Sequence, residues 1–169
     1  DILDHALEIL PESALLIGLR GKMYVETHLS EEKGMEEMER SLAIDPKQPE
    51  ILLLLGQLYH NRKKYSEALA AFQKCAKQSP KMAQAHLARM TTYIYLDKKE
   101  IALKTGRWIS ENCPPSPNTP QFYIFEILQS LAQDQEKKGR ELFSKMAGPL
   151  QRFDPWIVQA LFMLFSREK

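Results

Sequence analysis

The sequence predicts an all-α protein built from antiparallel helix hairpins, with about eight to ten helices and no β-sheet. The strongest observation is an internal repeat with a step of about 34 residues, in which Tyr59, Ala68 and Pro80 reappear as Tyr93, Ala102 and Pro114. The second is a set of capping residues, each followed by a proline that suits the first turn of a helix: Ser79-Pro80, Thr119-Pro120 and Asp154-Pro155. Together they predict a stacked array of helix pairs.

The segment Ile51–Pro80 resembles one nearly complete tetratricopeptide repeat. The residues that carry the resemblance are Leu52, Leu55, Gly56, Tyr59, Ala68, Phe72, Cys75 and Pro80, with Leu in place of the usual Trp and Cys in place of a small residue. The resemblance implies a right-handed superhelical stack of hairpins, a solenoid in which each repeat buries its apolar face only against its neighbours. It also implies a non-enzymatic scaffold that holds other proteins.

The repeat step divides the chain into six segments. They are the end of a preceding repeat at 1–13, a repeat-like unit at 14–46, repeats at 47–80 and 81–114, a degenerate hairpin at 118–153 and an apolar C-terminal helix at 154–169. Because Leu3, Ala6 and Pro11 match late repeat positions, we expect the chain to begin inside a second helix, as a piece of a longer array. Trp156–Phe165 is apolar nearly all round, which suits either an internal cap or an interface.

The unit at 14–46 matches the repeat only with one inserted residue. Gly21 and Tyr24 are in register on one side, and Gly34 and Pro46 on the other. We expect the insertion in the turn Thr27–Glu32, since surface turns tolerate changes of length.

In the unit at 47–80, Pro49 suits a first helical position, and the first helix is expected to run to about Asn61. The second is expected to run from an N-cap at Ser66 to about Gln78. Cys75, at a position that packs a small residue, is predicted to be a buried, reduced thiol that forms no disulfide with Cys113.

In the unit at 81–114, helices are expected over about Lys81 to Leu96 and Lys99 to Asn112. Gly106 stands where a large residue is expected, and we expect Trp108 to fill the space. The prolines of 114–117 break the helical pattern. Helices are expected again around Pro120–Gln133 and Glu136–Met146.

The resemblance implies that the first helix of each repeat lines a concave surface that binds a partner. The predicted contact residues are Leu19, Lys22, Glu26, Leu53, Leu54, Gln57, His60, Asn61, Gln84, Leu87, Ala88, Thr91 and Tyr95. The centre of this surface is apolar, which favours an amphipathic helix or an extended apolar segment of another protein. The carboxylate clamp of chaperone-binding relatives is missing, because Leu19, Leu54 and Ala88 stand at one of its positions. The alternative for Leu53 and Leu54 is that other parts of the chain cover them.

Charge and motif content argue against other classes of function. The chain has 23 Lys and Arg against 22 Asp and Glu, so general affinity for nucleic acid or anionic membranes is not expected. Its longest apolar runs, Ile51–Leu55 and Ala160–Leu164, are far shorter than the roughly 18 residues of a membrane span. The four histidines are isolated, and no phosphate loop, nucleophile motif or Cys/His metal spacing is present. We therefore expect no catalytic residues, no metal and no cofactor.

Two alternatives stay open at this point. Basic clusters at Arg62-Lys63-Lys64, Lys98-Lys99 and Lys137-Lys138 leave room for a helical repeat protein that contacts RNA through its outer edge. The chain also suits a regulatory segment of a larger enzyme. Reduced cysteines and the lack of a basic-then-apolar leader favour the cytosol or nucleus.

Overall fold

The computed structural model describes residues 2–113, 124, 126–127, 129–130, 133, 135–145 and 155–166. Its helices are α1 (Ile2–Ile9), α2 (Ala14–Glu26), α3 (Glu31–Ile44), α4 (Pro49–Asn61), α5 (Tyr65–Gln78), α6 (Ala83–Tyr95), α7 (Lys99–Asn112), α9 (Glu136–Lys145) and α10 (Pro155–Ser166). The described residues contain no strand, so the predicted all-α class is confirmed. They form two compact units, Asp1–Ser79 and Pro80–Lys169. None of the helices in these ranges is long and apolar enough to cross a membrane.

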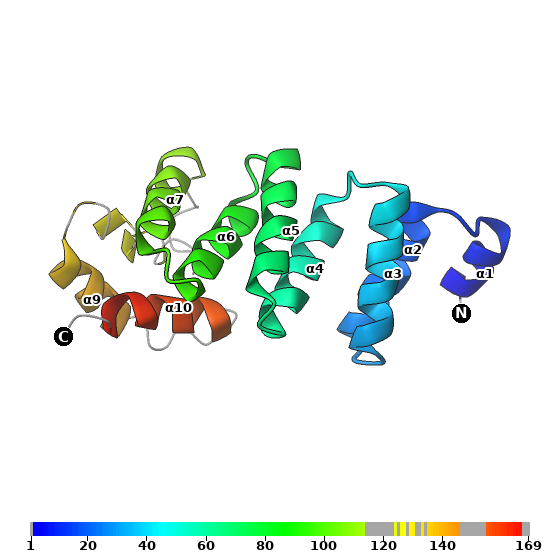
Figure 1. The fold of residues 1–169 in the computed structure, drawn as a ribbon, viewed down its shortest axis with the longest axis horizontal. Helices are drawn as coiled ribbons and strands as arrows, with labels where there is room; N and C mark the ends of the chain where they lie inside the picture. Colours follow the sequence, from blue (N-terminus) through cyan, green and yellow to red (C-terminus); the bar gives the residue numbers. More distant parts are fainter. Residues whose placement is uncertain are drawn as a thin grey trace. The chain divides into compact units, whose positions relative to one another are not determined.

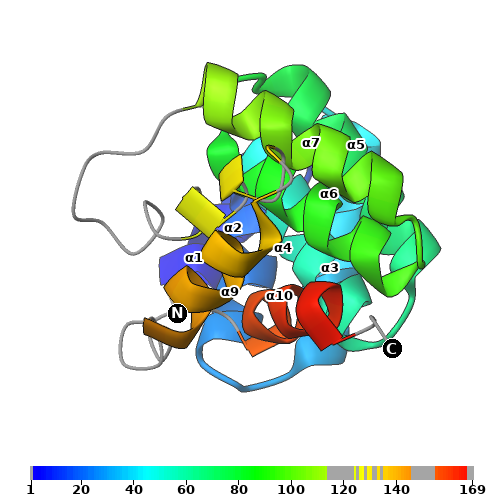
Figure 2. The same ribbon diagram turned by 90° about the vertical axis from the view of Figure 1, so that its left-hand side faces the viewer.

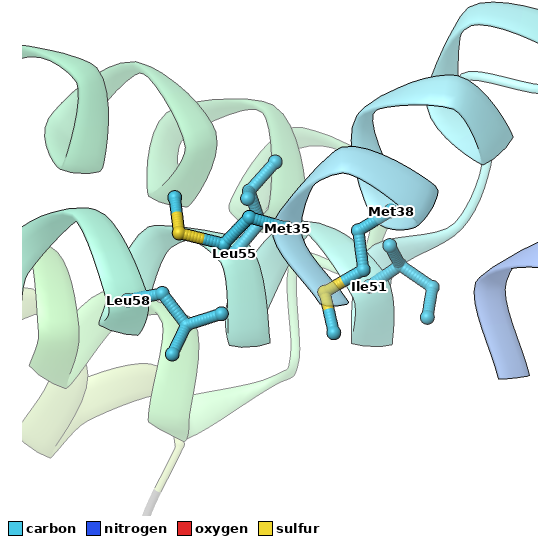
Figure 3. Packing of buried hydrophobic residues seen from close by; sticks show 5 residues of the cluster. All are labelled: Met35, Met38, Ile51, Leu55 and Leu58. Atoms are coloured by element: carbon cyan, nitrogen blue, oxygen red, sulfur yellow. The ribbon is translucent and has the colours of Figure 1, made fainter. Parts of the chain in front are cut away.

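The first unit consists of the hairpins α2–α3 and α4–α5, with α1 in contact with α2 (Figure 1). Its core lies where α3 meets α4, and Figure 3 shows the five side chains gathered there. They are Met35, Met38, Ile51, Leu55 and Leu58, each at most 7% exposed. Burial of such side chains contributes roughly 1.5–3 kcal/mol each. The two hairpins are therefore joined mainly by apolar packing.

A second link between the two hairpins is polar. The Gln48 side-chain amide, at the N-cap of α4, donates to Ser41 Oγ of α3 at 2.8 Å, and Ser41 Oγ donates to the Ala14 carbonyl oxygen at 2.6 Å. In the next hairpin, Cys75 holds the position equivalent to Ser41, and its Sγ donates to the Pro49 carbonyl oxygen at 3.1 Å. The Gln48 bond thus links α3 to the start of the next hairpin, whereas the Ser41 and Cys75 bonds each tie the second helix of a hairpin to the start of its first.

Small residues let the two helices of each hairpin approach closely. A Cβ added at Gly56 would lie 2.5 Å from Cε1 of Phe72, and one added at Gly21 would lie 2.8 Å from the Gly34 carbonyl oxygen. At the positions equivalent to Gly56 and Phe72, the hairpin α6–α7 has Met90, which is fully buried, and a buried Gly106. In this hairpin the large residue of the pair therefore stands on the first helix and the small one on the second.

The turn inside each hairpin is a left-handed helix cap. After α4, Lys63 has a φ of 60°, its N–H donates to the His60 carbonyl oxygen, and the Lys64 N–H donates to that of Tyr59. This pair of bonds is a Schellman motif. Asp97 repeats the arrangement after α6 with a φ of 59°, and His28 repeats it after α2 with a φ of 55°.

The expected insertion lies in the turn after α2. This turn spans 27–30, one residue more than 62–64 and 96–98. The extra residue gives α3 a separate N-cap, because Ser30 Oγ accepts a hydrogen bond from the Lys33 N–H at 3.2 Å. In the shorter turns, Lys64 and Lys98 both close the Schellman motif and stand at the N-cap, without a side-chain bond there.

In the second unit, the hairpin α6–α7 is joined by α10, which contacts α6 (Figures 1 and 2). The buried residues of α10 are Ile157, Ala160 and Leu161, which share one helix face. The C-terminal apolar helix thus packs within the unit, as the internal-cap interpretation required.

Three local predictions need correction. Ser79-Pro80 does not start a helix, because α6 begins at Ala83 and the Pro80 carbonyl oxygen instead accepts a hydrogen bond from His86 Nε2 at 2.9 Å. Ser66 is not an N-cap, since α5 already begins at Tyr65. Trp108 fills no buried space. It is 37% exposed and stacks on the ring of His86 with centroids 4.1 Å apart.

Several other predicted features are confirmed, and one predicted helix lies mostly outside the described residues. The helices expected to end at about Asn61 and Asn112 do so, and the helix expected around Glu136–Met146 is α9. Cys75 is buried as predicted, and Cys113 is buried as well. Thr119-Pro120 and most of the helix expected around Pro120–Gln133 lie outside the described residues.

Candidate partner-binding surface

On α2, the predicted contact residues lie along one accessible face. Leu19, Lys22 and Glu26 follow one another at helical spacing, and Leu15 precedes Leu19 by one turn. The leucines are exposed to 66% (Leu15) and 42% (Leu19). The repeat register places Leu15 on the same side of α2 as the other three.

On α4, the predicted contact residues are only partly accessible. Leu53, Leu54 and Gln57 are half-buried and Asn61 is exposed. Leu54 packs against the core between α3 and α4, so it serves the fold as well as the surface. α2 and α4 contact each other within the first unit. Their residues at the predicted contact positions, with His60 left out and Leu15 added, are called the α2–α4 strip: Leu15, Leu19, Lys22, Glu26, Leu53, Leu54, Gln57 and Asn61.

His60 belongs to the interior and not to this surface. It is 4% exposed, and its ring meets that of Tyr65 edge to face with centroids 5.0 Å apart. Burial disfavours the charged imidazolium and lowers the pKa of His60 to about 4. At neutral pH His60 is therefore an uncharged core residue.

On α6, most of the predicted contact residues are also inaccessible. Leu87, Ala88 and Thr91 are at most 7% exposed, and only Gln84 is fully exposed. Tyr95 is half-buried, and its hydroxyl donates to Gln159 Oε1 of α10 at 3.0 Å. The structure thus removes α6 from the accessible surface. A binding role for the α2–α4 strip stays a prediction.

Charges on the strip are few and partly neutralised. Lys22 Nζ lies 3.6 Å from Glu26 Oε1, which is an i, i+4 ion pair on α2. Glu50, exposed in the first turn of α4, adds a carboxylate beside Leu53 and Leu54. The strip is therefore a mainly apolar surface with a slight negative charge.

The basic cluster at 62–64 is engaged with acidic residues of the same unit. Arg62 Nε lies 2.8 Å from Glu31 Oε1, and Arg62 Nη2 lies 2.9 Å from Glu32 Oε1. Lys63 is held in the left-handed cap of α4. In addition, the described residues contain no group of three or more His, Cys, Asp or Glu placed to hold a metal ion.

Comparison with known proteins agrees with this architecture. The family model described as tetratricopeptide repeat matches residues 49–82, the hairpin α4–α5 with its flanking turns. No curated protein matches the chain.

Solved structures are similar over most of the chain. The crystal structure of MamA aligns with a TM-score of 0.66 at 15% identity, covering 89% of this chain and 85% of that one. YrrB, described as a tetratricopeptide repeat protein with an unusual peptide-binding site, aligns with a TM-score of 0.64 at 15% identity, covering 93% and 78%.

A third solved structure contains a bound peptide. The first tetratricopeptide domain of Spaghetti (RPAP3), bound to the HSP90 peptide SRMEEVD, aligns with a TM-score of 0.54 at 17% identity, covering 78% and 96%. Residues 49–82 are therefore a tetratricopeptide repeat, and the chain shares its helical fold with these structures.

Proposed function

We propose that this chain is a non-enzymatic protein-interaction module that binds a segment of another protein on the α2–α4 strip. The observation that carries the proposal is the exposure of Leu15 and Leu19 one turn apart on the first helix of a hairpin. Two neighbours of the same fold are described as having a peptide-binding site or a bound peptide. Exposed apolar side chains grouped in this way are typical of interaction surfaces.

The leucines of the strip can contribute to the free energy of binding. Burying a leucine side chain contributes roughly 1.5–3 kcal/mol, before the cost of ordering the partner. Leu15, 66% exposed, has most of this contribution still to make and Leu19, 42% exposed, somewhat less than half, whereas half-buried Leu53 and Leu54 have less. We therefore expect α2 to dominate affinity and α4 to shape the surface.

The RNA alternative has less support. Arg62, the guanidinium of the largest basic cluster, is already used by Glu31 and Glu32. Phosphate binding there would have to compete with both carboxylates.

The test is affinity capture with the intact chain and two matched variants. Leu15→Gln combined with Leu19→Gln removes the apolar groups while keeping a good helix former. Leu29→Gln is the control, because Leu29 is 68% exposed but lies in the turn between α2 and α3. We expect the double variant to lose the captured protein while its helicity and Tm stay near wild type, and Leu29→Gln to retain it. Capture that survives the double variant would refute the proposed site.

A further inference from the structure

Within the second unit, a helix already lies on the surface equivalent to the α2–α4 strip. Ala88, Thr91 and Tyr95 of α6 stand at the repeat positions of Leu19, Lys22 and Glu26 on α2. α10 contacts α6, and the bond from the Tyr95 hydroxyl to Gln159 Oε1 comes from one of these positions (Figure 2). The chain thus contains an example of what a first helix of this array accepts.

The contact made by α10 has a simple pattern. Its buried residues Ile157, Ala160 and Leu161 follow the i, i+3, i+4 spacing of one helical face. Gln159 stays exposed beside them and accepts the bond from Tyr95, while Phe162 is 59% exposed. α10 therefore combines a narrow buried aliphatic face with a polar side chain that bonds to α6.

The α2–α4 strip presents matching chemistry in an accessible state. Leu15 and Leu19 lie one turn apart on α2, so the aliphatic side chains of a second helix can pack between them. A helical ligand also satisfies its own backbone hydrogen bonds, so it asks for few polar partners. The strip offers the neutral side chains of Gln57 and Asn61 as polar partners, while Lys22 is paired with Glu26.

Charge favours one type of flank on such a helix. The strip itself contains one pair of opposite charges, Lys22 and Glu26, which neutralise each other. At the starts of α2 and α4, exposed Glu12, Asp45 and Glu50 outnumber exposed Lys47, so this region attracts a basic flank and repels an acidic one.

We propose that the partner segment is an amphipathic α-helix of the α10 type, with aliphatic residues at i, i+3 and i+4 and basic flanks. This inference rests on the proposed function of the strip and specifies its ligand. An extended peptide or an acidic helix is the outcome that would contradict it.

The test uses three labelled synthetic peptides of about 15 residues, long enough for roughly four helical turns. The first places leucines at i, i+3, i+4 and i+7 on an Ala/Lys background. The second has the same composition with leucines at every second position, and the third keeps the helical pattern on an Ala/Glu background. Fluorescence anisotropy measures the Kd of each for the intact chain.

We expect the helical lysine peptide to bind best, with a Kd at least about tenfold below that of either other peptide. The Leu15→Gln/Leu19→Gln variant should weaken its binding by at least about tenfold, because two anchor sites are lost. Leu29→Gln should bind like wild type.

Each contrary result points to a different error. Tighter, strip-dependent binding of the period-two peptide would overturn the helical ligand while leaving the strip as a binding site. Equal binding of the lysine and glutamate peptides would overturn the charge preference. No binding of any peptide would overturn the inference, and the capture experiment would then decide separately whether the strip binds a partner at all.

Discussion

Gly56→Ala tests the close contact between α4 and α5 most directly. In an open helix interior this change would stabilise the protein by about 1 kcal/mol, because Ala has the higher helix propensity. Here the new Cβ would lie 2.5 Å from Cε1 and 2.7 Å from Cδ1 of Phe72, closer than carbon atoms pack. Phe72 is fully buried, so its ring has no free space to enter.

The expected magnitude follows from the two opposing effects. Overpacking a core costs roughly 1–3 kcal/mol, and a clash this short with a rigid ring belongs in the upper half of that range. After subtracting the gain in helix propensity, we expect a net loss of about 1–2 kcal/mol in the free energy of unfolding. For a chain of this size the Tm should fall by about 2–8 °C.

The assay is urea unfolding followed by far-UV circular dichroism, on single and double variants. Adding Phe72→Leu to Gly56→Ala should recover about 1 kcal/mol relative to additivity, because the smaller side chain makes room for the methyl group. Gly21→Ala is the matched contrast. Its Cβ would lie 2.8 Å from the Gly34 carbonyl oxygen, which is a backbone atom. Adding Met38→Ala shortens a neighbouring side chain but leaves this oxygen in place, so the double variant should recover little stability. A rise in stability for Gly56→Ala, or no coupling with Phe72→Leu, would refute this account of the hairpin.

Three further predictions concern backbone, histidine and cysteine chemistry. Lys63→Gly should raise the free energy of unfolding by up to about 1 kcal/mol, because Lys63 has a φ of 60°; the neighbouring Arg62→Gly, at a φ of −81°, should give no gain by the same urea assay. His60 is buried with its pKa lowered to about 4. Its contribution to the free energy of unfolding is therefore fully present above its unfolded pKa near 6.5 and is lost as the pH falls to about 4. It amounts to about 3 kcal/mol, and His60→Leu should flatten stability curves over that window; an unchanged pH dependence would contradict the assignment. Burial raises the pKa of Cys75 to about 11 and also raises that of Cys113, so a thiol reagent should modify both slowly, with Cys113 first because it is 9% exposed against 0%. Fast labelling of Cys75, followed by mass spectrometry, would show that α5 is not packed as described.

Sequence patterns were most informative where the physical cause is local. The start of α4 follows from Pro49, whose fixed φ suits the first turn, and the repeat step of about 34 residues placed the hairpins α4–α5 and α6–α7. The single inserted residue in the turn after α2 was also predicted, because the repeat fixes the register on both sides of it.

Local sequence patterns gave a wrong prediction where the space between two packed helices can be filled by a residue of either helix. Gly106 was expected to be compensated by Trp108 of the same helix, but Trp108 is 37% exposed, and the fully buried large residue of the equivalent pair is Met90 of the facing helix. Only the total volume between two helices is constrained, so the sequence of one helix does not tell which residue fills the space.

For the candidate binding surface, too, the sequence predicted one part and the tertiary structure decided another. The family resemblance predicted which positions of each first helix face a partner, and helical periodicity explains why those positions share one side of the helix. It did not determine which of these faces stays accessible. The tertiary structure covers α6 with α10, a helix more than 60 residues away in the sequence as the bond from Tyr95 to Gln159 shows, and leaves Leu15 and Leu19 exposed. Periodicity sets the direction of a side chain, whereas its burial depends on what the rest of the chain places against it.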